Sequence, residues 1–587
     1  MSRKLKLSDL EPMLDKGVAA PARDEVSQRA YDDVRQAVFG DKRDERAAAV
    51  KTKRALRLID LGRSADGVRL AVSATEDDPS CVPAYVVAGA GLDQLGLLTP
   101  ALGFLEEALR IAPTNPLIPA VLADIAKRNG DLDSAEKCAR IASQIDPLNW
   151  RNAASLALIL RDRERFDEAI ELLRQQIFLF PEEPILWNTL SAVLIDQGDG
   201  ENAKIFANEA LRINPRYFEA MHNLGVALID EGEFEQAHAL FVKSASVNAS
   251  MAQKGNGGLS RAHALLGSGR LSEGWEAYDI RVQPGKGLVE YDAFKPRWEG
   301  EGLRGRSLLL IAEQGLGDEV MFMTIAAEAV EALGPEGKLH IACEPRLMAL
   351  FQRSFPQSSL YGYATHRING RPKRAVLELD WDQVDVWAPM GDLARYFRPT
   401  LESFDGNRPF LRPDPERVAT FAAQRAAFGP GLCVGIAWRS LLMNYQRQRY
   451  FADIEQWEPV LRTPGVTFVS LQPGDTAGEE ARIAAQFGVT LQRFDGLDVK
   501  SDLDGIVAAA RSLDLVIAPM NASSNLAAAA GVDVWFTAGH KDWSMLGAER
   551  IPWYPRSRLF LAPRAGAWSA LYAKVGAALA AETATSR

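Results

Sequence analysis

Residues 184–215 read PILWNTLSAVLIDQGDGENAKIFANEALRINP, and this stretch is one copy of a pattern that fills most of the first half of the chain. Apolar residues recur at steps of three and four over residues 185–194 and again over residues 205–211, which is the spacing of two amphipathic helices. Gly198 lies between the two segments, where glycine lets a chain turn, and Pro215 follows the second, where proline stops a helix. The stretch therefore predicts a helical hairpin.

Three classes of position recur every 34 residues in the same register. The small residue of each unit lets its two helices approach, the glycine marks the turn, and the proline ends the unit. The prolines are Pro79, Pro113, Pro147, Pro181 and Pro215, the glycines are Gly62, Gly96, Gly130, Gly198 and Gly232, and the small residues are Gly67, Ala101, Ala135, Ala169, Ala203 and Ala237.

This period resembles the tetratricopeptide repeat, with about six copies over residues 48–249 and a divergent copy that continues to about residue 285. The Gly-Asn-Gly-Gly run at residues 255–258 is expected to break the register with an insertion. We assign residues 48–285 to the repeat domain and residues 1–47 to a helical extension, with an amphipathic stretch at 5–14 and a helix at 25–39.

Stacked repeats of this kind leave a concave surface that usually binds polypeptide segments, so a protein partner is the expected ligand of the first half. The alternative is a rigid spacer that only orients the second half. Asn188, His222 and Asn223 lie on the inner helices and are candidate contacts, although a solvated face is the favoured interpretation of any one of them.

Length and composition limit the remaining possibilities. A chain of 587 residues exceeds the size of one core and predicts several domains, while 47% apolar and 25% charged residues are typical of an ordinary globular protein. A net charge of −10 argues against nucleic acid as the main ligand. The start lacks the apolar stretch of a secretory signal, and no apolar run is long enough to span a bilayer, which predicts a cytoplasmic protein. The cysteines are far apart and suggest neither a zinc nor a redox site: Cys81, Cys138, Cys343 and Cys433.

In the second half, short apolar runs of strand length alternate with helical segments. This alternation predicts parallel sheets covered by helices on both faces, in two successive Rossmann-like lobes at residues 286–410 and 411–587 with a cleft between them. The predicted strands are 307–312, 338–343 and 384–388 in the first lobe and 433–438, 466–471, 515–518 and 534–537 in the second.

Ligands of such sheets bind where the strands end in loops that lead into helix N-termini. The first loop of interest contains Gln314, Gly315 and Gly317, whose glycines permit close backbone approach, and ends at Asp318. Asp318 is a candidate general base or acceptor ligand. A plain helix N-cap is an equally good interpretation of this aspartate from the residues alone.

The second lobe contains the candidate anion-binding residues. Backbone amides and polar side chains at the start of the helix after strand 515–518 are suited to cradle a phosphate, and arginine forks suit a diphosphate or a carboxylate. Capping residues and a solvated basic loop are the alternatives. His540 and Asp542 lie at the same edge. The candidate anion-binding set is Arg439, Arg447, Arg449, Gln472, Asn521, Ser523, Ser524, Asn525 and Lys541.

Four segments of the second half resemble bacterial tetratricopeptide-repeat glycosyltransferases related to the heptosyltransferases. They are Leu303-Arg-Gly-Arg-Ser-Leu-Leu-Leu after Trp298, Ala312-Glu-Gln-Gly-Leu-Gly-Asp318, Pro464-Gly-Val-Thr-Phe-Val-Ser-Leu-Gln472, and Trp553-Tyr-Pro555. The resemblance implies a GT-B fold, an acceptor on the first lobe, a nucleotide-sugar donor on the second, and no metal. It also implies that Asp318 lies near the acceptor hydroxyl.

The donor loop departs from those relatives. Where they have Asp-Thr-x-x-x-His-Leu-Ala, this chain has Met520-Asn-Ala-Ser-Ser-Asn-Leu-Ala527, which suggests a different donor because the replacements stay small and hydrogen-bonding. A repeat arm with this loop resembles flagellin glycosyltransferases, which implies a nonulosonic acid of the pseudaminic type, carried by CMP, and flagellin Ser or Thr as acceptor. Arg439, Arg447 and Arg449 suit the carboxylate of such a sugar.

Two other hypotheses compete with transfer to a protein. A non-catalytic adaptor with a decayed transferase body would explain the missing acid and histidine of the donor loop. Transfer to lipopolysaccharide would leave the repeat arm without a purpose.

Overall fold

The computed structural model describes residues 34–38, 47–248, 255–283, 287–368, 371–443, 445–448 and 450–585. Of the predicted N-terminal helix, residues 34–38 are described and are helical, whereas the amphipathic stretch at 5–14 and Arg449 lie outside the described residues. The chain divides into two compact units, Met1–Tyr217 and Phe218–Arg587. This boundary falls inside the predicted repeat domain, so the last repeat hairpins belong to the second unit.

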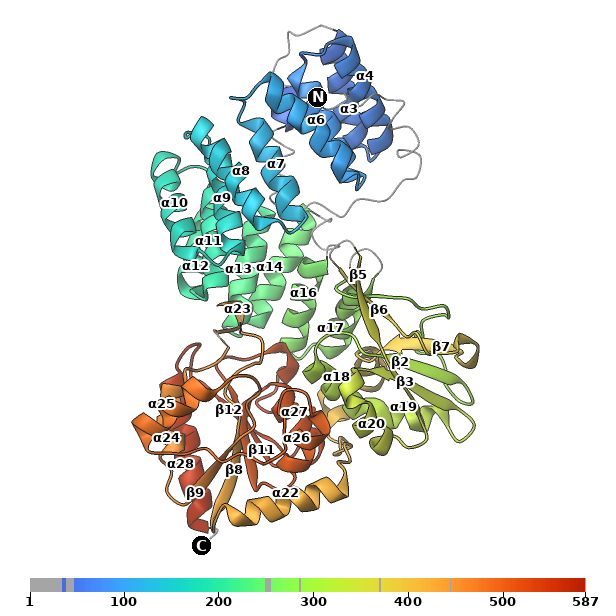
Figure 1. Cartoon of the computed structure of the whole chain (residues 1–587), viewed down its shortest axis with the longest axis vertical. Helices are drawn as coiled ribbons and strands as arrows, with labels where there is room; N and C mark the ends of the chain where they lie inside the picture. The colour runs from blue at the N-terminus through green and yellow to red at the C-terminus, as the bar shows by residue number, and fades with distance from the viewer. Residues whose placement is uncertain are drawn as a thin grey trace. The chain divides into compact units, whose positions relative to one another are not determined.

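The first unit is a stack of antiparallel helical hairpins (Figure 1). Each hairpin packs against the next one along the chain, as the repeat period predicts. The hairpins are α3(Ala47–Asp60) with α4(Ser64–Asp77), α5(Val82–Gln94) with α6(Leu98–Ile111), α7(Leu117–Arg128) with α8(Leu132–Ile145), α9(Trp150–Asp162) with α10(Phe166–Leu179), and α11(Pro184–Gln197) with α12(Gly200–Ile213).

The recurring residues have the roles that their positions predict. The turn glycines adopt left-handed backbone, for example Gly198 with φ 88°, and Glu164 takes the same conformation with φ 60° in the repeat that lacks the glycine. The small residues of the hairpins are buried. Each proline stands two residues beyond the end of a helix, as Pro215 does after α12. The 34-residue period therefore specifies the turn between the two helices of a hairpin, the close contact of those helices, and the end of the second helix.

The second unit begins with two more hairpins, α13(Phe218–Asp230) with α14(Phe234–Val247) and α16(Gly255–Gly267) with α17(Leu271–Tyr278), followed by the short helix η1(Asp279–Val282). The glycine run at 255–258 does not form a loop between helices, because it makes up the first residues of the helix α16. The insertion instead displaces the turn glycine to Gly269, which has φ 81° and follows Gly232 by 37 residues rather than 34.

The first lobe contains a parallel four-stranded sheet in the order β4-β3-β2-β7. A smaller sheet, in the order β1-β6-β5, joins its edge region and was not predicted. The strands are β1(Glu290–Tyr291), β2(Ser307–Ile311), β3(Lys338–Cys343), β4(Ser359–Gly362), β5(Ala364–Ile368), β6(Arg371–Ala375) and β7(Val386–Pro389). The helices are α18(Leu316–Phe322), η2(Met323–Ile325), α19(Ala326–Leu333), η3(Pro345–Leu347), α20(Met348–Ser354), η4(Trp381–Gln383), α21(Asp392–Phe397) and η5(Leu401–Phe404).

The second lobe contains a parallel five-stranded sheet in the order β12-β11-β10-β8-β9 (Figure 1). Its strands are β8(Leu432–Ile436), β9(Val466–Ser470), β10(Leu515–Pro519), β11(Val534–Ala538) and β12(Arg558–Leu561), and the last of them was not predicted. Its helices are α22(Pro415–Ala427), α23(Tyr445–Gln448), η6(Ile454–Trp457), α24(Glu458–Leu461), α25(Ala477–Phe487), α26(Leu503–Ala510), α27(Ala522–Ala529), η7(Trp543–Met545) and α28(Trp568–Thr585).

The predicted fold class is therefore confirmed: an all-α tetratricopeptide-repeat solenoid precedes an α/β body of two Rossmann-like lobes, the GT-B fold. A continuous apolar core runs from the hairpin α16–α17 through both lobes. None of the helices in the described ranges combines the length and the apolar character that crossing a bilayer requires.

Candidate active site

A cavity of about 590 Å³ lies where the strands of both lobes end in loops, and we call it the interlobe cavity. Its walls come from the loop after β2, the loop after β8, the start of α27 after β10, and the segment after β11. The carboxyl ends of parallel strands thus converge on one space, which is where ligands of such sheets bind. The predicted cleft between the lobes is present.

Asp318 is the acid of the first lobe in this cavity. It stands at position N3 of α18 and accepts a hydrogen bond on Oδ2 from the Gly315 N–H at 3.0 Å, so Gly315 is the N-cap residue and Asp318 caps the helix start from one turn inside it. Burial raises the pKa of Asp318 to about 6, the Gly315 N–H opposes this rise, and the carboxylates of Glu313 and Asp542 add to it. Capping and a cavity position are compatible, because the hydrogen bond from Gly315 uses Oδ2 alone and Asp318 also lines the cavity.

The start of α27 approaches the loop of Asp318 directly. Asn525 donates from Nδ2 to the Gly317 carbonyl at 3.2 Å, whereas its buried Oδ1 has no protein partner in the described residues. A side chain at position 317 would meet Asn525, since an added Cβ would lie 2.9 Å from Nδ2. Glycine at 317 therefore permits the contact that joins the two loops.

The other polar residues at this helix start mostly serve the backbone. Asn521 accepts from the Ser524 N–H at 3.0 Å and lines the cavity. Ser524 donates to the Pro519 carbonyl at 2.8 Å and does not line it. Ser523 lines the cavity but donates to the Leu471 carbonyl at 3.2 Å.

The arginines after β8 lie beside this helix start, where Asn521 Nδ2 donates to the Arg439 carbonyl at 3.5 Å. Arg439 lines the cavity and is held by a two-point ion pair with Glu479, with N···O distances of 2.8 and 2.7 Å. Arg447 also lines the cavity, is exposed, and donates to Ser440 Oγ at 3.1 Å. Gln472 is fully buried beneath this loop, where it accepts from the Trp438 and Arg439 N–H groups at 2.8 and 2.9 Å. It positions the loop and does not line the cavity.

The structure thus brings most of the predicted residues together. The cavity wall contains Gly315, Gly317, Asp318, Arg439, Arg447, Asn521, Ser523 and Asn525. The predicted residues away from it, among those described, are Gln314, Gln472, Ser524 and Lys541. Gln314 donates to the Tyr278 hydroxyl at 2.6 Å, and Lys541 lies against the Gly232 turn.

Other cavity residues were missed. Arg346 from the first lobe and Lys500 from the second add positive charge, and Tyr450 and Trp543 add aromatic surface. Arg346 donates to the Lys500 carbonyl at 2.9 Å, which brings the two lobes together. Arg346 follows a predicted strand end, so its position was a usable signal, whereas Lys500 lies in a loop with no motif. In the described part of the chain, no cluster of His, Cys, Asp and Glu is arranged to hold a metal ion.

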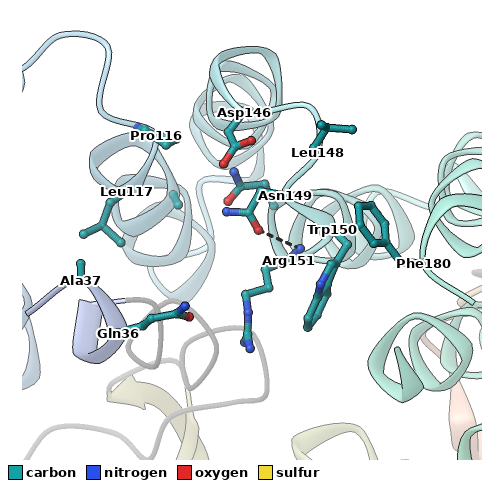
Figure 2. A pocket seen from close by; sticks show the side chains of 12 residues that line it. Gln36, Ala37, Pro116, Leu117, Asp146, Leu148, Asn149, Trp150, Arg151 and Phe180 are labelled. Atoms are coloured by element: carbon teal, nitrogen blue, oxygen red, sulfur yellow. Dashed lines mark hydrogen bonds between the residues drawn. The ribbon is translucent and has the colours of Figure 1, made fainter. Parts of the chain in front are cut away.

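The repeat arm has a second cavity, of about 500 Å³, in the first unit. Figure 2 shows its walls: Pro116 and Leu117 at the start of α7, the segment from Asp146 to Asn149 with Trp150 and Arg151 at the start of α9, and Gln36 with Ala37. The Arg151 guanidinium lies 4.5 Å from the Trp150 ring centroid. This is a candidate contact region for a polypeptide. Asn188, in contrast, has no exposed surface, so its assignment as a partner contact is wrong.

His222 and Asn223, the remaining predicted partner contacts, lie on α13 in the second unit and are half-buried. The His222 ring packs 5.3 Å from the ring of Phe241 on α14. The structure leaves their role as contacts a prediction.

Helical repeats followed by two parallel-sheet lobes and a cavity between them define a tetratricopeptide-repeat protein with an α/β body of two Rossmann-like lobes. The tetratricopeptide repeat family matches residues 121–184 and 154–218. The chain is 38% identical over 530 residues to Protein FlbA of Caulobacter vibrioides, a match that covers 90% of this chain and 89% of the relative. The chain therefore belongs to the FlbA family.

Two further similarities are more limited. A peroxisomal targeting signal receptor of Candida albicans is 32% identical over 82 residues, which is 14% of each chain. The solved structure of an O-GlcNAc transferase mutant from Thermobaculum terrenum covers 80% of this chain and 92% of its own, with 16% identity and a TM-score of 0.33.

Proposed function

We propose that this protein is an O-glycosyltransferase that captures flagellin through its repeats and transfers a pseudaminic-type nonulosonic acid from a CMP-linked donor to Ser or Thr. One observation carries the proposal: Asp318 of the first lobe and the start of α27 in the second lobe line the same interlobe cavity. They are joined by the 3.2 Å hydrogen bond from Asn525 to the carbonyl of Gly317, the residue before Asp318. A base and an anion-binding helix start in one cavity are what acceptor and donor require.

The charges on the cavity wall support an anionic donor. The wall contains more cationic than anionic side chains: the cations are Arg346, Arg439, Arg447 and Lys500, and the carboxylates are those of Asp318 and Asp542. Because Glu479 already pairs with Arg439, the arginine is fixed in place and less of its charge remains for a ligand. An excess of cationic side chains stabilises a departing phosphate, and a sugar carboxylate offers a second anion for the same wall.

The chemistry assigned to Asp318 is proton removal. As the acceptor hydroxyl oxygen bonds to the anomeric carbon, Asp318 takes its proton, and the bond from that carbon to the phosphate oxygen breaks so that CMP leaves with the electron pair. A carboxylate with a pKa near 6 is ionised at neutral pH and is still basic enough for this role. The resemblance of the repeat arm and the Asn-Ala-Ser-Ser-Asn loop to flagellin glycosyltransferases supports the named donor and acceptor.

The test combines nucleotide binding with transfer. We expect calorimetric titration to show that CMP binds more tightly than UDP or GDP. We also expect purified flagellin, incubated with the protein and CMP-pseudaminic acid, to gain the mass of the sugar. Asp318→Asn should lower transfer by about a hundredfold or more and leave CMP affinity unchanged. Asp382→Asn is the matched control, since that aspartate is exposed and does not line the cavity.

Two results would count against the proposal in different ways. If no nucleotide binds, the second half is not a working transferase and the adaptor hypothesis replaces this one. If Asp318→Asn retains full transfer, Asp318 is not the base even though the enzyme is real.

A further inference from the structure

The last repeat hairpin, α16–α17 with η1, is built into the body of the two lobes. Ala262, Leu266, Leu271, Trp275 and Tyr278 belong to the same buried core as the apolar residues of both lobes. The Trp275 indole N–H donates to the Arg398 carbonyl of the first lobe at 3.0 Å in a fully buried bond. On the other side, Gly269 lies against the Leu546 carbonyl of the second lobe. The hairpin contacts both lobes.

Tyr278, the last residue of α17, reaches the loop that carries Asp318. Its hydroxyl accepts a hydrogen bond from Gln314 Nε2 at 2.6 Å, and only 1% of the residue is exposed. Gln314 directly precedes Gly315, whose N–H donates to Asp318. The Tyr278 ring packs against Phe322 of α18, with 6.4 Å between ring centroids. Tyr278 thus holds both ends of the segment in which Asp318 is placed.

His263 of α16 supports the wall formed by the second lobe, where the Tyr278 ring also lies 5.5 Å from the Trp543 ring. The His263 ring stacks on Trp543 with 5.1 Å between centroids and an interplanar angle of 4°. Trp543 and the neighbouring Asp542 both line the interlobe cavity, and Asp542 accepts from the Ser544 N–H at 2.9 Å. Burial lowers the pKa of His263 to about 4, although the Asp542 carboxylate acts in the other direction, so the ring is neutral at physiological pH. It acts as a flat apolar support.

A buried ionic cluster fixes the hairpin to the first lobe more firmly than to the second. Arg281 of η1 donates from Nη2 to Glu313 at 3.1 Å and to Asp392 at 2.9 Å, and all three side chains are almost fully buried. The contacts to the second lobe, by comparison, are ring stacking and close packing. Ion pairs and hydrogen bonds therefore attach the loop of Asp318 to the hairpin. The segment after β11 is held against the hairpin by packing alone.

We infer that Tyr278 and His263 are positioning residues, and that the last repeat hairpin supports two walls of the cavity from behind rather than being the end of a separate binding arm. Tyr278 orients the Asp318 loop through Gln314, and His263 orients Asp542 and Trp543 by stacking. The identity of what the cavity holds rests on the proposed function, but the placement of the two loops does not.

Hydrogen–deuterium exchange of the full chain tests this placement without any activity. In Tyr278→Phe, which keeps the ring and removes the hydroxyl, we expect backbone amides of residues 312–322 to exchange about fivefold faster, since one hydrogen bond is lost. Residues 540–546 should not change. In His263→Ala we expect the larger increase in residues 540–546 and a smaller one in residues 312–322, because the His263 ring stacks on Trp543 and also lies 6.1 Å from the Tyr278 ring. His263→Phe, which retains a flat ring, should restore slow exchange. Strands β8 and β10 serve as internal references in every variant.

A functional arm separates positioning from stability. Tyr278→Phe should lower the rate of flagellin modification at saturating donor about tenfold and change CMP affinity less than twofold, because the donor wall is untouched. Unchanged exchange in residues 312–322, or an equal rise across both lobes, would overturn the inference. If wild-type protein transfers no sugar, the proposed function fails, while the exchange pattern still decides whether the hairpin positions the two loops.

Discussion

At the scale of single residues, Asp318 shows how a common capping residue gains a chemical role. The cap itself needs only an oxygen that accepts the Gly315 N–H. What distinguishes Asp318 is that α18 starts at the cavity, where burial raises its pKa to about 6. A residue of this kind works as a base only above its pKa.

The pH dependence of transfer should follow from this. We expect the rate to rise as pH increases through about 6 and then to level off, because Asp318 must lose its proton first. The pH profile of flagellin modification measures it. Glu319→Gln provides the control: burial raises the pKa of Glu319 to about 7, but its side chain contacts Tyr363 and Glu344 outside the cavity wall. If the rising part of the pH profile shifts in Glu319→Gln, the profile reports the titration of Glu319 and not that of Asp318.

The same shift has a consequence for stability. The folded chain binds the Asp318 proton more tightly than the unfolded chain, so the stability that this group contributes is present below pH about 4 and is lost as pH rises to about 6. At pH 8 the buried charge should cost about 3 kcal/mol, because the pKa rises from its ordinary value of 3.8 to about 6 and each tenfold change in proton affinity is worth ~1.4 kcal/mol. Asp318→Asn, inactive in transfer, should therefore unfold at a higher denaturant concentration than wild type at pH 8 and lose that advantage at pH 4. Equal midpoints at pH 8 would contradict the raised pKa.

At the scale of elements, the sequence predicted the repeats and the central strands because each carries a strong local signal. A 34-residue period or a run of buried apolar residues needs no knowledge of the partner segment. The strands β5 and β6 lack such a signal: they contain charged residues and Pro372, and they pair mainly with each other. The prediction that Gln472 binds a ligand failed for a related reason. Only the fold shows that its side-chain oxygen accepts hydrogen bonds from the backbone N–H groups after β8.

The junction of η1, β2 and α21 offers a prediction about how elements are held together. Arg281→Met removes the guanidinium and leaves Glu313 and Asp392 buried with less compensation, although Arg297 still pairs with Asp392 at 2.7 Å. Breaking a buried ion pair from one side typically costs about 3–5 kcal/mol, and we expect a loss at the lower end of this range in urea unfolding of the full chain. Arg395→Met, at a half-exposed ion pair 3.7 Å from Asp279, should cost less than about 1 kcal/mol. Similar losses in both variants would show that the buried cluster has no special role.

At the scale of the whole molecule, the division of the chain lies between Tyr217 and Phe218, so the second unit carries two repeat hairpins of its own. A shortened protein of residues 218–587 retains every described residue of the interlobe cavity and the hairpin behind it. A protein of residues 287–587 loses Trp275, Tyr278 and Arg281, and it leaves the Glu313 carboxylate buried without its arginine.

The two shortened proteins should therefore behave differently. We expect residues 218–587 to unfold cooperatively on heating and to bind CMP within about twofold of the full chain, because its core is complete. Residues 287–587 should melt without a sharp transition and bind no nucleotide, since the wall behind Asp318 and Trp543 is missing. Flagellin modification by residues 218–587 should fall well below that of the full chain if the first unit captures the acceptor. Undiminished modification would instead make those repeats a spacer, and the acceptor would then be recognised by the second unit itself.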